Sequence, residues 1–197
     1  MKHPVKIFTI LIFIVLTACD QNSQNAKQKS IQLDTSKKLR LLTYGGPPDM
    51  ERKAAENVIA DKWGIEFYGV AGCIVTQELI DSVDKHNKEV KALIETKYGK
   101  YWQTSFDKEV KEELIKQKVT SSLLDKEKLI ITKRNDLEKE GNGLHYHFLP
   151  INKSEYKVSA TGWGQINGKD EYVSYFRYFV DIDNRKVKLT SDSLMKE

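Results

Sequence analysis

Residues 38–70, KLRLLTYGGPPDMERKAAENVIADKWGIEFYGV, carry the clearest structural pattern in the sequence. Residues 38–44 predict a short strand, which the Gly-Gly-Pro-Pro sequence at 45–48 ends. Apolar residues at helical spacing then predict a helix from Met50 to Trp63, closed by Gly64 as its C-terminal cap. Residues 65–70 predict a second strand. A strand, a helix and a strand within about 30 residues predict a βαβ unit with parallel strands.

Two amphipathic helices are expected after this unit. Thr76 is a plausible N-cap for a long helix that ends near Tyr98, just before Gly99. A second helix carries apolar residues at regular steps of four, namely Trp102, Phe106, Val110 and Leu114.

The pattern changes after about residue 122, where short runs favour strands. We expect strands over 128–132, 144–149, 156–166, 172–182 and 186–189. Asn167-Gly168 is typical of a two-residue hairpin between the third and the fourth of these. The sequence therefore predicts an α+β fold, with an α/β domain over 37–120 and an antiparallel β-rich part over 121–197. It leaves open whether the two parts share one core.

The first nineteen residues have the features of a bacterial export signal. Lys2, His3 and Lys6 make a positive start, and residues 7–18 are uncharged and largely apolar. A helix of this length covers roughly 18 Å, well short of a hydrocarbon core of about 30 Å. Residues 1–18 are therefore predicted to be a signal peptide rather than a membrane-spanning anchor.

The sequence Leu16-Thr17-Ala18-Cys19 is typical of a bacterial lipobox. In such a motif the cysteine thiol is acylated and becomes the first residue of the mature chain. We expect the membrane to be reached through N-terminal acyl chains such as palmitate, followed by a flexible polar tether over 19–36. The predicted location is the bacterial cell envelope, with the folded part outside the cytoplasm; the membrane and leaflet stay open.

Composition excludes several function classes. Of the 197 residues, 40% are hydrophobic and 30% are charged, which is typical of a globular chain. The net charge of +4 is spread without a basic block, so nucleic acid is not an expected partner. Two cysteines are too few for a disulfide framework or a four-cysteine zinc site. No bound cofactor is expected, and with Cys19 lipidated Cys73 is left as the free thiol.

Two segments, AAENVIADKWGIEFYGVAGCIVTQELIDSVDKHNKEV at 54–90 and ETKYGKYWQTSFDKEV at 95–110, resemble the FEKKY domain of small bacterial proteins. The resemblance covers residues 44–110, roughly the middle third of the chain. It implies an α/β fold and brings no catalytic or binding residues with it.

Cys73 is the main candidate for chemistry. It follows a predicted strand and precedes a helix N-terminus, where the helix dipole lowers the pKa of a thiol. Parallel strands end at the same edge of a sheet, where open α/β sheets bind ligands. The candidate ligand-binding residues at this edge are Tyr44, Gly45, Gly46, Gly72 and Thr76.

The favoured interpretation of Cys73 is nevertheless a buried structural residue, because cysteine often behaves as a small hydrophobe. His86 lies about three helical turns from the predicted N-cap, roughly 15 Å away. It is therefore not expected to act as a general base for the Cys73 thiol.

Three further residues, two histidines and a tryptophan, are candidates for a binding role. His145 and His147 point to one face of a predicted strand, but no spacing marks a third metal ligand. They are only weak candidates for a metal site. Trp163 lies between Gly162 and Gly164, which indicates a close approach of backbone or ligand; core packing of the indole is favoured.

The sequence thus predicts a lipid-anchored envelope protein whose folded part binds a protein or small-molecule partner without catalysis. The alternative is an envelope thiol enzyme or redox protein that uses Cys73. A structural or assembly lipoprotein is a third interpretation, and would expose a large apolar patch on the C-terminal sheet.

Overall fold

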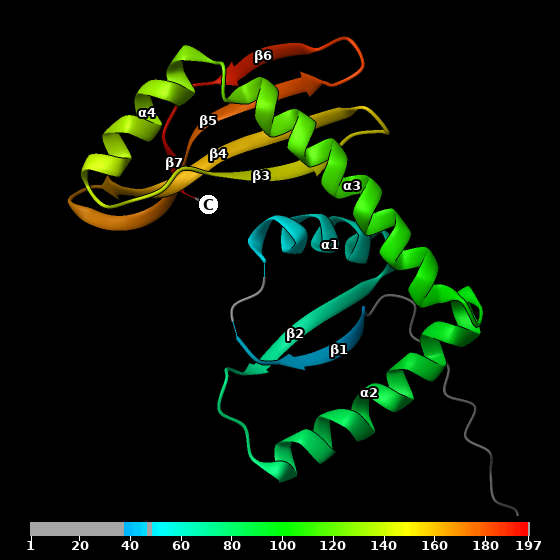
Figure 1. The fold of residues 1–197 in the computed structure, drawn as a ribbon. Coiled ribbons are helices and arrows are strands. Elements are labelled where there is room, and N and C mark those ends of the chain that lie inside the picture. The colour runs from blue at the N-terminus through cyan, green and yellow to red at the C-terminus, as the bar shows by residue number, and fades with distance from the viewer. Residues whose placement is uncertain (1–37, 47–48, 197) are drawn as a thin grey trace, which may run out of the picture. The chain divides into compact units, whose positions relative to one another are not determined.

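The computed structural model describes residues 38–46 and 49–196. The predicted signal peptide, Cys19 and the predicted tether lie outside the described residues. The fold is α+β, as the sequence predicts, with helices and a parallel strand pair followed by an antiparallel β-rich part (Figure 1).

The predicted βαβ unit is present. Strand β1 (Leu39–Tyr44) pairs in parallel with β2 (Ile65–Ala71), and helix α1 (Met50–Trp63) connects them. Asp49 caps α1 by accepting hydrogen bonds from two backbone N–H groups of its first turn. Gly64 ends the helix with φ at 65°, a left-handed conformation that suits glycine.

Helices α2 (Gln77–Tyr98) and α3 (Trp102–Leu124) also follow the prediction. The hydroxyl of Thr76 accepts from the N–H of Leu79 at 3.3 Å, which caps α2 as expected.

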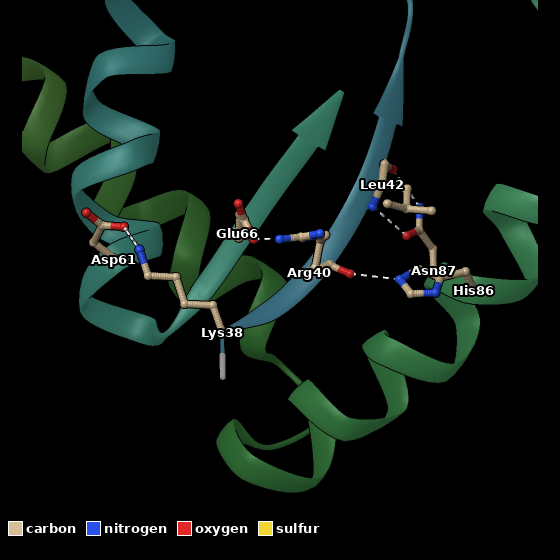
Figure 2. A network of polar contacts seen from close by, with 7 residues as sticks. All are labelled: Lys38, Arg40, Leu42, Asp61, Glu66, His86 and Asn87. Carbon is tan, nitrogen blue, oxygen red and sulfur yellow. Dashed lines mark hydrogen bonds and ion pairs between the residues drawn. The ribbon is translucent and has the colours of Figure 1, made fainter. Parts of the chain in front are cut away.

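The outer edge of β1 is held by side chains of α2, as Figure 2 shows. The Asn87 amide accepts from the N–H of Leu42 and donates to the carbonyl of Leu42, both at 2.8 Å. His86 Nε2 lies 3.0 Å from the carbonyl of Arg40. These side chains make the hydrogen bonds that a third strand would make, so α2 closes this edge of the sheet.

The predicted strand over 128–132 is wrong. The segment opens helix α4 (Lys128–Lys139). Two adjacent isoleucines and a threonine favoured a strand, since β-branched residues are common there. The longer window decides against it, because Ile130 and Leu137 lie two helical turns apart and are both buried. Leu129 and Ile131 are exposed, as a helix with one buried face requires.

The C-terminal part is an antiparallel sheet in the order β3-β4-β5-β6, with β7 also paired to β5. Asn167 and Gly168 have φ values of 52° and 74°, which form the predicted tight hairpin between β4 and β5. The strand bounds are β3 (His145–Pro150), β4 (Glu155–Ile166), β5 (Lys169–Asp181), β6 (Lys186–Ser191) and β7 (Met195–Lys196).

Two clusters of buried side chains form the interior, and α3 contributes to both. One lies around β1, β2 and the first three helices; from α3 it takes Trp102, Phe106 and Val110. The other lies against the antiparallel sheet and includes Leu123 and Leu124. Position 120, the predicted boundary between the α/β domain and the β-rich part, lies within this helix. The described residues belong to one compact unit.

Candidate functional site

The carboxyl ends of β1 and β2 lie together, as the parallel topology predicts. Tyr44 pairs with Ala71, and the N–H of Gly45 donates to the carbonyl of Gly72 at 3.1 Å. A Cβ atom at Gly46 would lie 3.7 Å from Cys73 Sγ, so the thiol sits beside the Gly-Gly turn.

Cys73 is exposed, so the interpretation of this residue as a buried hydrophobe is wrong. Its thiol has no hydrogen bond or ion pair with any residue that the structure describes. His86 contacts the carbonyl of Arg40 on β1, as Figure 2 shows, and is not paired with the thiol. The edge therefore offers an accessible thiol without an activating base on the described residues.

His145 and His147 are both exposed on β3 and lie two residues apart, on one face of the strand. Within residues 38–46 and 49–196, no group of three or more histidine, cysteine or acidic side chains is placed to hold a metal ion.

Trp163 is not a core residue: 53% of it is exposed, which corrects the prediction of core packing. Its ring meets that of Tyr172 on β5 edge to face, with centroids 5.8 Å apart. The close approach indicated by the flanking glycines is present. A Cβ at Gly162 would lie 2.7 Å from the carbonyl oxygen of Gly143, and one at Gly164 would lie 2.5 Å from the Tyr175 hydroxyl.

A cavity of about 400 Å³ lies between the start of α1, the C-terminal half of α3 and β3. Its size is within the range of small-molecule sites, about 300–1,000 Å³. Leu114 and Phe148 supply apolar wall, and Ser121 and Ser122 supply hydroxyl groups. The remaining lining residues are Glu51, Gln117, Lys118, Asp125 and Lys126.

Most charges at the cavity are paired. Lys118 forms an ion pair with Glu51 at 3.1 Å. Asp125 accepts from Arg134 at 2.6 Å and from the Tyr146 hydroxyl at 2.7 Å. The hydrogen bond to Asp125 raises the pKa of the Arg134 guanidinium. Burial, and then the hydrogen bond to Asp125, raise the pKa of Tyr146, so its hydroxyl stays a donor at neutral pH.

Gln117 connects the cavity to a buried polar cluster behind it. Its amide donates to the carboxylate of Glu113 at 2.9 Å, one helical turn away on α3. The Tyr156 hydroxyl on β4 lies 3.0 and 3.1 Å from the two oxygens of the same carboxylate. Burial, and then the charge of Glu113, raise the pKa of Tyr156, so this hydroxyl also stays protonated. These bonds fix one wall of the cavity.

Sequence reasoning missed this cavity, although α3 carries a signal. The apolar stripe that reaches Val110 and Leu114 continues at the same helical spacing into Gln117 and Ser121. Glu113, Gln117 and Thr120 are buried. Polar residues on the buried side of a helix indicate a hydrogen-bonded cluster or a binding site.

No protein-family model, curated protein or solved structure matches the chain. The resemblance to the FEKKY domain therefore stays a prediction. Among the described helices, none combines the length and the apolar character needed to cross a bilayer.

Proposed function

We propose that this chain is a lipid-anchored protein of the bacterial cell envelope whose folded part binds a small molecule in the α3 cavity. The anchor rests on the sequence alone, on the positive start, the apolar run and the lipobox ending at Cys19. The observation that carries the binding role is the cavity of about 400 Å³.

Two properties of the cavity support binding rather than catalysis. It combines an apolar wall of Leu114 and Phe148 with a few polar groups, which is the usual make-up of a small-molecule site. The acidic groups that line it or lie behind it are engaged: Asp125 with Arg134 and Tyr146, and Glu113 with Tyr156 and Gln117. Groups held in this way shape a site and orient a ligand.

The anchor is tested by metabolic labelling with radiolabelled palmitate in a bacterial host. Label on the wild-type chain that is lost in Cys19→Ala supports lipidation at that thiol. Cys73→Ala is the matched control and retains the label. Label that persists in Cys19→Ala contradicts the proposal.

Binding is tested with the mature lipidated protein, which begins at Cys19, in phosphatidylcholine nanodiscs. Isothermal titration calorimetry measures it, with empty nanodiscs subtracted. The probes are 1-naphthalenesulfonate and its neutral counterpart 1-naphthalenesulfonamide. Ser122→Trp places a large ring in the cavity, and we expect it to abolish binding of whichever probe binds the wild type. Circular dichroism checks that the variant is folded. Failure of both probes to bind the wild type contradicts the binding role.

A thiol enzyme or redox protein is the second candidate, because Cys73 is exposed beside the Gly-Gly turn. Labelling of the folded protein does not separate the two candidates, since an exposed thiol reacts in either case. The two candidates are separated by the ratio of the thiol-exchange rates of the folded and the denatured protein. At a pH well below the free-thiol pKa of about 8.5, an activated thiol exchanges with glutathione disulfide faster in the folded than in the denatured protein, because more of it is thiolate. We expect a ratio near one.

A further inference from the structure

Some of the charged side chains at the α3 cavity have an ion-pair partner and one does not. Glu51 and Lys118 pair with each other, and Asp125 pairs with Arg134. Lys126 also lines the cavity, yet none of the acidic groups that the structure describes lies within 4.0 Å of its ammonium. One positive charge at the cavity is therefore left without a counter-charge.

The hydroxyl groups at the cavity, like the unpaired positive charge, favour a ligand that accepts hydrogen bonds. Ser121 and Ser122 line the cavity from the last turns of α3, and their side chains make no hydrogen bond with the described residues. Each hydroxyl has a proton to donate, and an ammonium has three. Of the carboxylate oxygens at the cavity, Asp125 Oδ1 already accepts from Arg134 and from the Tyr146 hydroxyl.

The apolar wall of the cavity lies next to these donors. Leu114 comes from α3 and Phe148 from β3, and both are half-buried, so each keeps accessible surface. An aromatic side chain of this kind packs against flat, apolar ring systems. A ligand that satisfies both features has an apolar body and one anionic head.

We infer that the cavity binds a small amphipathic organic anion, with its head at Lys126, Ser121 and Ser122 and its apolar body against Leu114 and Phe148. This inference rests on the proposed binding function and adds the chemical class of the ligand. The anionic head is a carboxylate, sulfonate or phosphate group, all of which accept several hydrogen bonds from such donors.

The test compares 1-naphthalenesulfonate with 1-naphthalenesulfonamide on the mature lipidated protein in phosphatidylcholine nanodiscs. The two probes share the apolar ring and differ in charge. We expect the sulfonate to bind about tenfold more tightly, as one charge-assisted hydrogen bond allows. The preference should weaken from 50 to 500 mM salt, because added ions screen the ammonium.

Variants at two lysines test whether the preference for the sulfonate comes from Lys126. Lys126→Gln removes the free charge and should reduce the dissociation-constant ratio of the two probes to about one, while Lys126→Glu should invert it. Lys128→Gln is the matched control: Lys128 is also exposed and has no ion pair with the described residues, but it does not line the cavity. It should leave the ratio unchanged. Both positions are at the surface, so these variants are expected to fold.

The outcomes separate the two proposals. Failure of both probes to bind in a manner sensitive to Ser122→Trp overturns the binding function, and the ligand class with it. Equal binding of both probes that is lost in Ser122→Trp keeps the binding function and overturns the inference. A preference for the sulfonate that survives Lys126→Gln also overturns the inference, because the charge then acts from elsewhere.

Discussion

The Tyr156 hydroxyl of β4 bonds to both carboxylate oxygens of Glu113 on α3, at 3.0 and 3.1 Å. Both residues are buried, with 0% of Tyr156 and 5% of Glu113 exposed. The ion pairs found among the described residues do not include Glu113, so hydrogen bonds from Tyr156 and Gln117 compensate its burial. A polar group buried in such a place needs hydrogen-bond partners. The contact ties α3 to the antiparallel sheet.

Removing that hydroxyl destabilises the protein. Tyr156→Phe takes away a donor that serves both carboxylate oxygens, which should lower the free energy of unfolding by about 1–3 kcal/mol. Tyr178→Phe is the matched control, because Tyr178 is equally buried but its hydroxyl has no hydrogen-bond partner among the described residues. That change should be neutral or stabilising. Urea titration measures both, and equal losses for the two variants would contradict this assignment.

Alkaline pH should destabilise the fold through its buried tyrosines. Burial, and then the charge of Glu127, raise the pKa of Tyr178 from 10.0 to about 12. As the pH rises, the unfolded chain therefore loses this proton at a lower pH than the folded chain does. The free energy of unfolding is constant in this respect below pH 10 and declines as the pH rises from 10 to 12. In Tyr178→Phe the decline in unfolding free energy over this interval should be shallower than in the wild type. Identical slopes would show that Tyr178 does not contribute.

Asn87 should protect the backbone amides of β1 from hydrogen exchange. Asn87→Ala removes both hydrogen bonds to Leu42 and exposes the edge of the strand, at a cost of about 1–3 kcal/mol. Amide hydrogen exchange at Leu42 should accelerate more than exchange in β5. Lys88→Ala, at the exposed neighbouring position, should change neither quantity. Unaltered exchange at Leu42 in Asn87→Ala would rule out the role given to this side chain.

The glycines beside Trp163 should tolerate no side chain. Gly162→Ala would bring a Cβ to 2.7 Å from the carbonyl oxygen of Gly143, so the backbone must shift. We expect a loss of about 1–3 kcal/mol in unfolding free energy, typical of overpacking. Gly72→Ala is the control, because a Cβ there meets no atom within 4 Å. Chemical denaturation compares the two, and a neutral Gly162→Ala would refute the close approach.

The first half of the fold was predictable because its signals are local. The Gly-Gly turn at 45–46, the C-cap at Gly64 and the N-cap at Thr76 mark ends that the structure reproduces. Parallel pairing of β1 and β2 followed from the single helix between them. α4 was missed because a short window at 130–132 favours a strand, and only the spacing to Leu137 reveals the helix.

The cavity could not be predicted, because its lining comes from segments far apart in the sequence. Glu51, Ser121 and Phe148 meet only once α1, α3 and β3 have packed. For the same reason the sequence misjudged the exposure of Cys73 and Trp163, since burial depends on which elements cover a residue. The edge from Tyr44 to Cys73 was correctly assembled, because parallel strands end at the same edge of a sheet.

The place where the ligand binds is found by mapping amide chemical shifts. The mature lipidated protein in phosphatidylcholine nanodiscs is titrated with 1-naphthalenesulfonate while its amide resonances are followed. We expect the largest changes at Ser121, Ser122, Lys126 and Phe148, and little change at 44–46 and 72–73. Changes centred on Gly46 and Cys73, with the α3 cavity unaffected, would contradict it and move the binding site to the edge of the parallel strands.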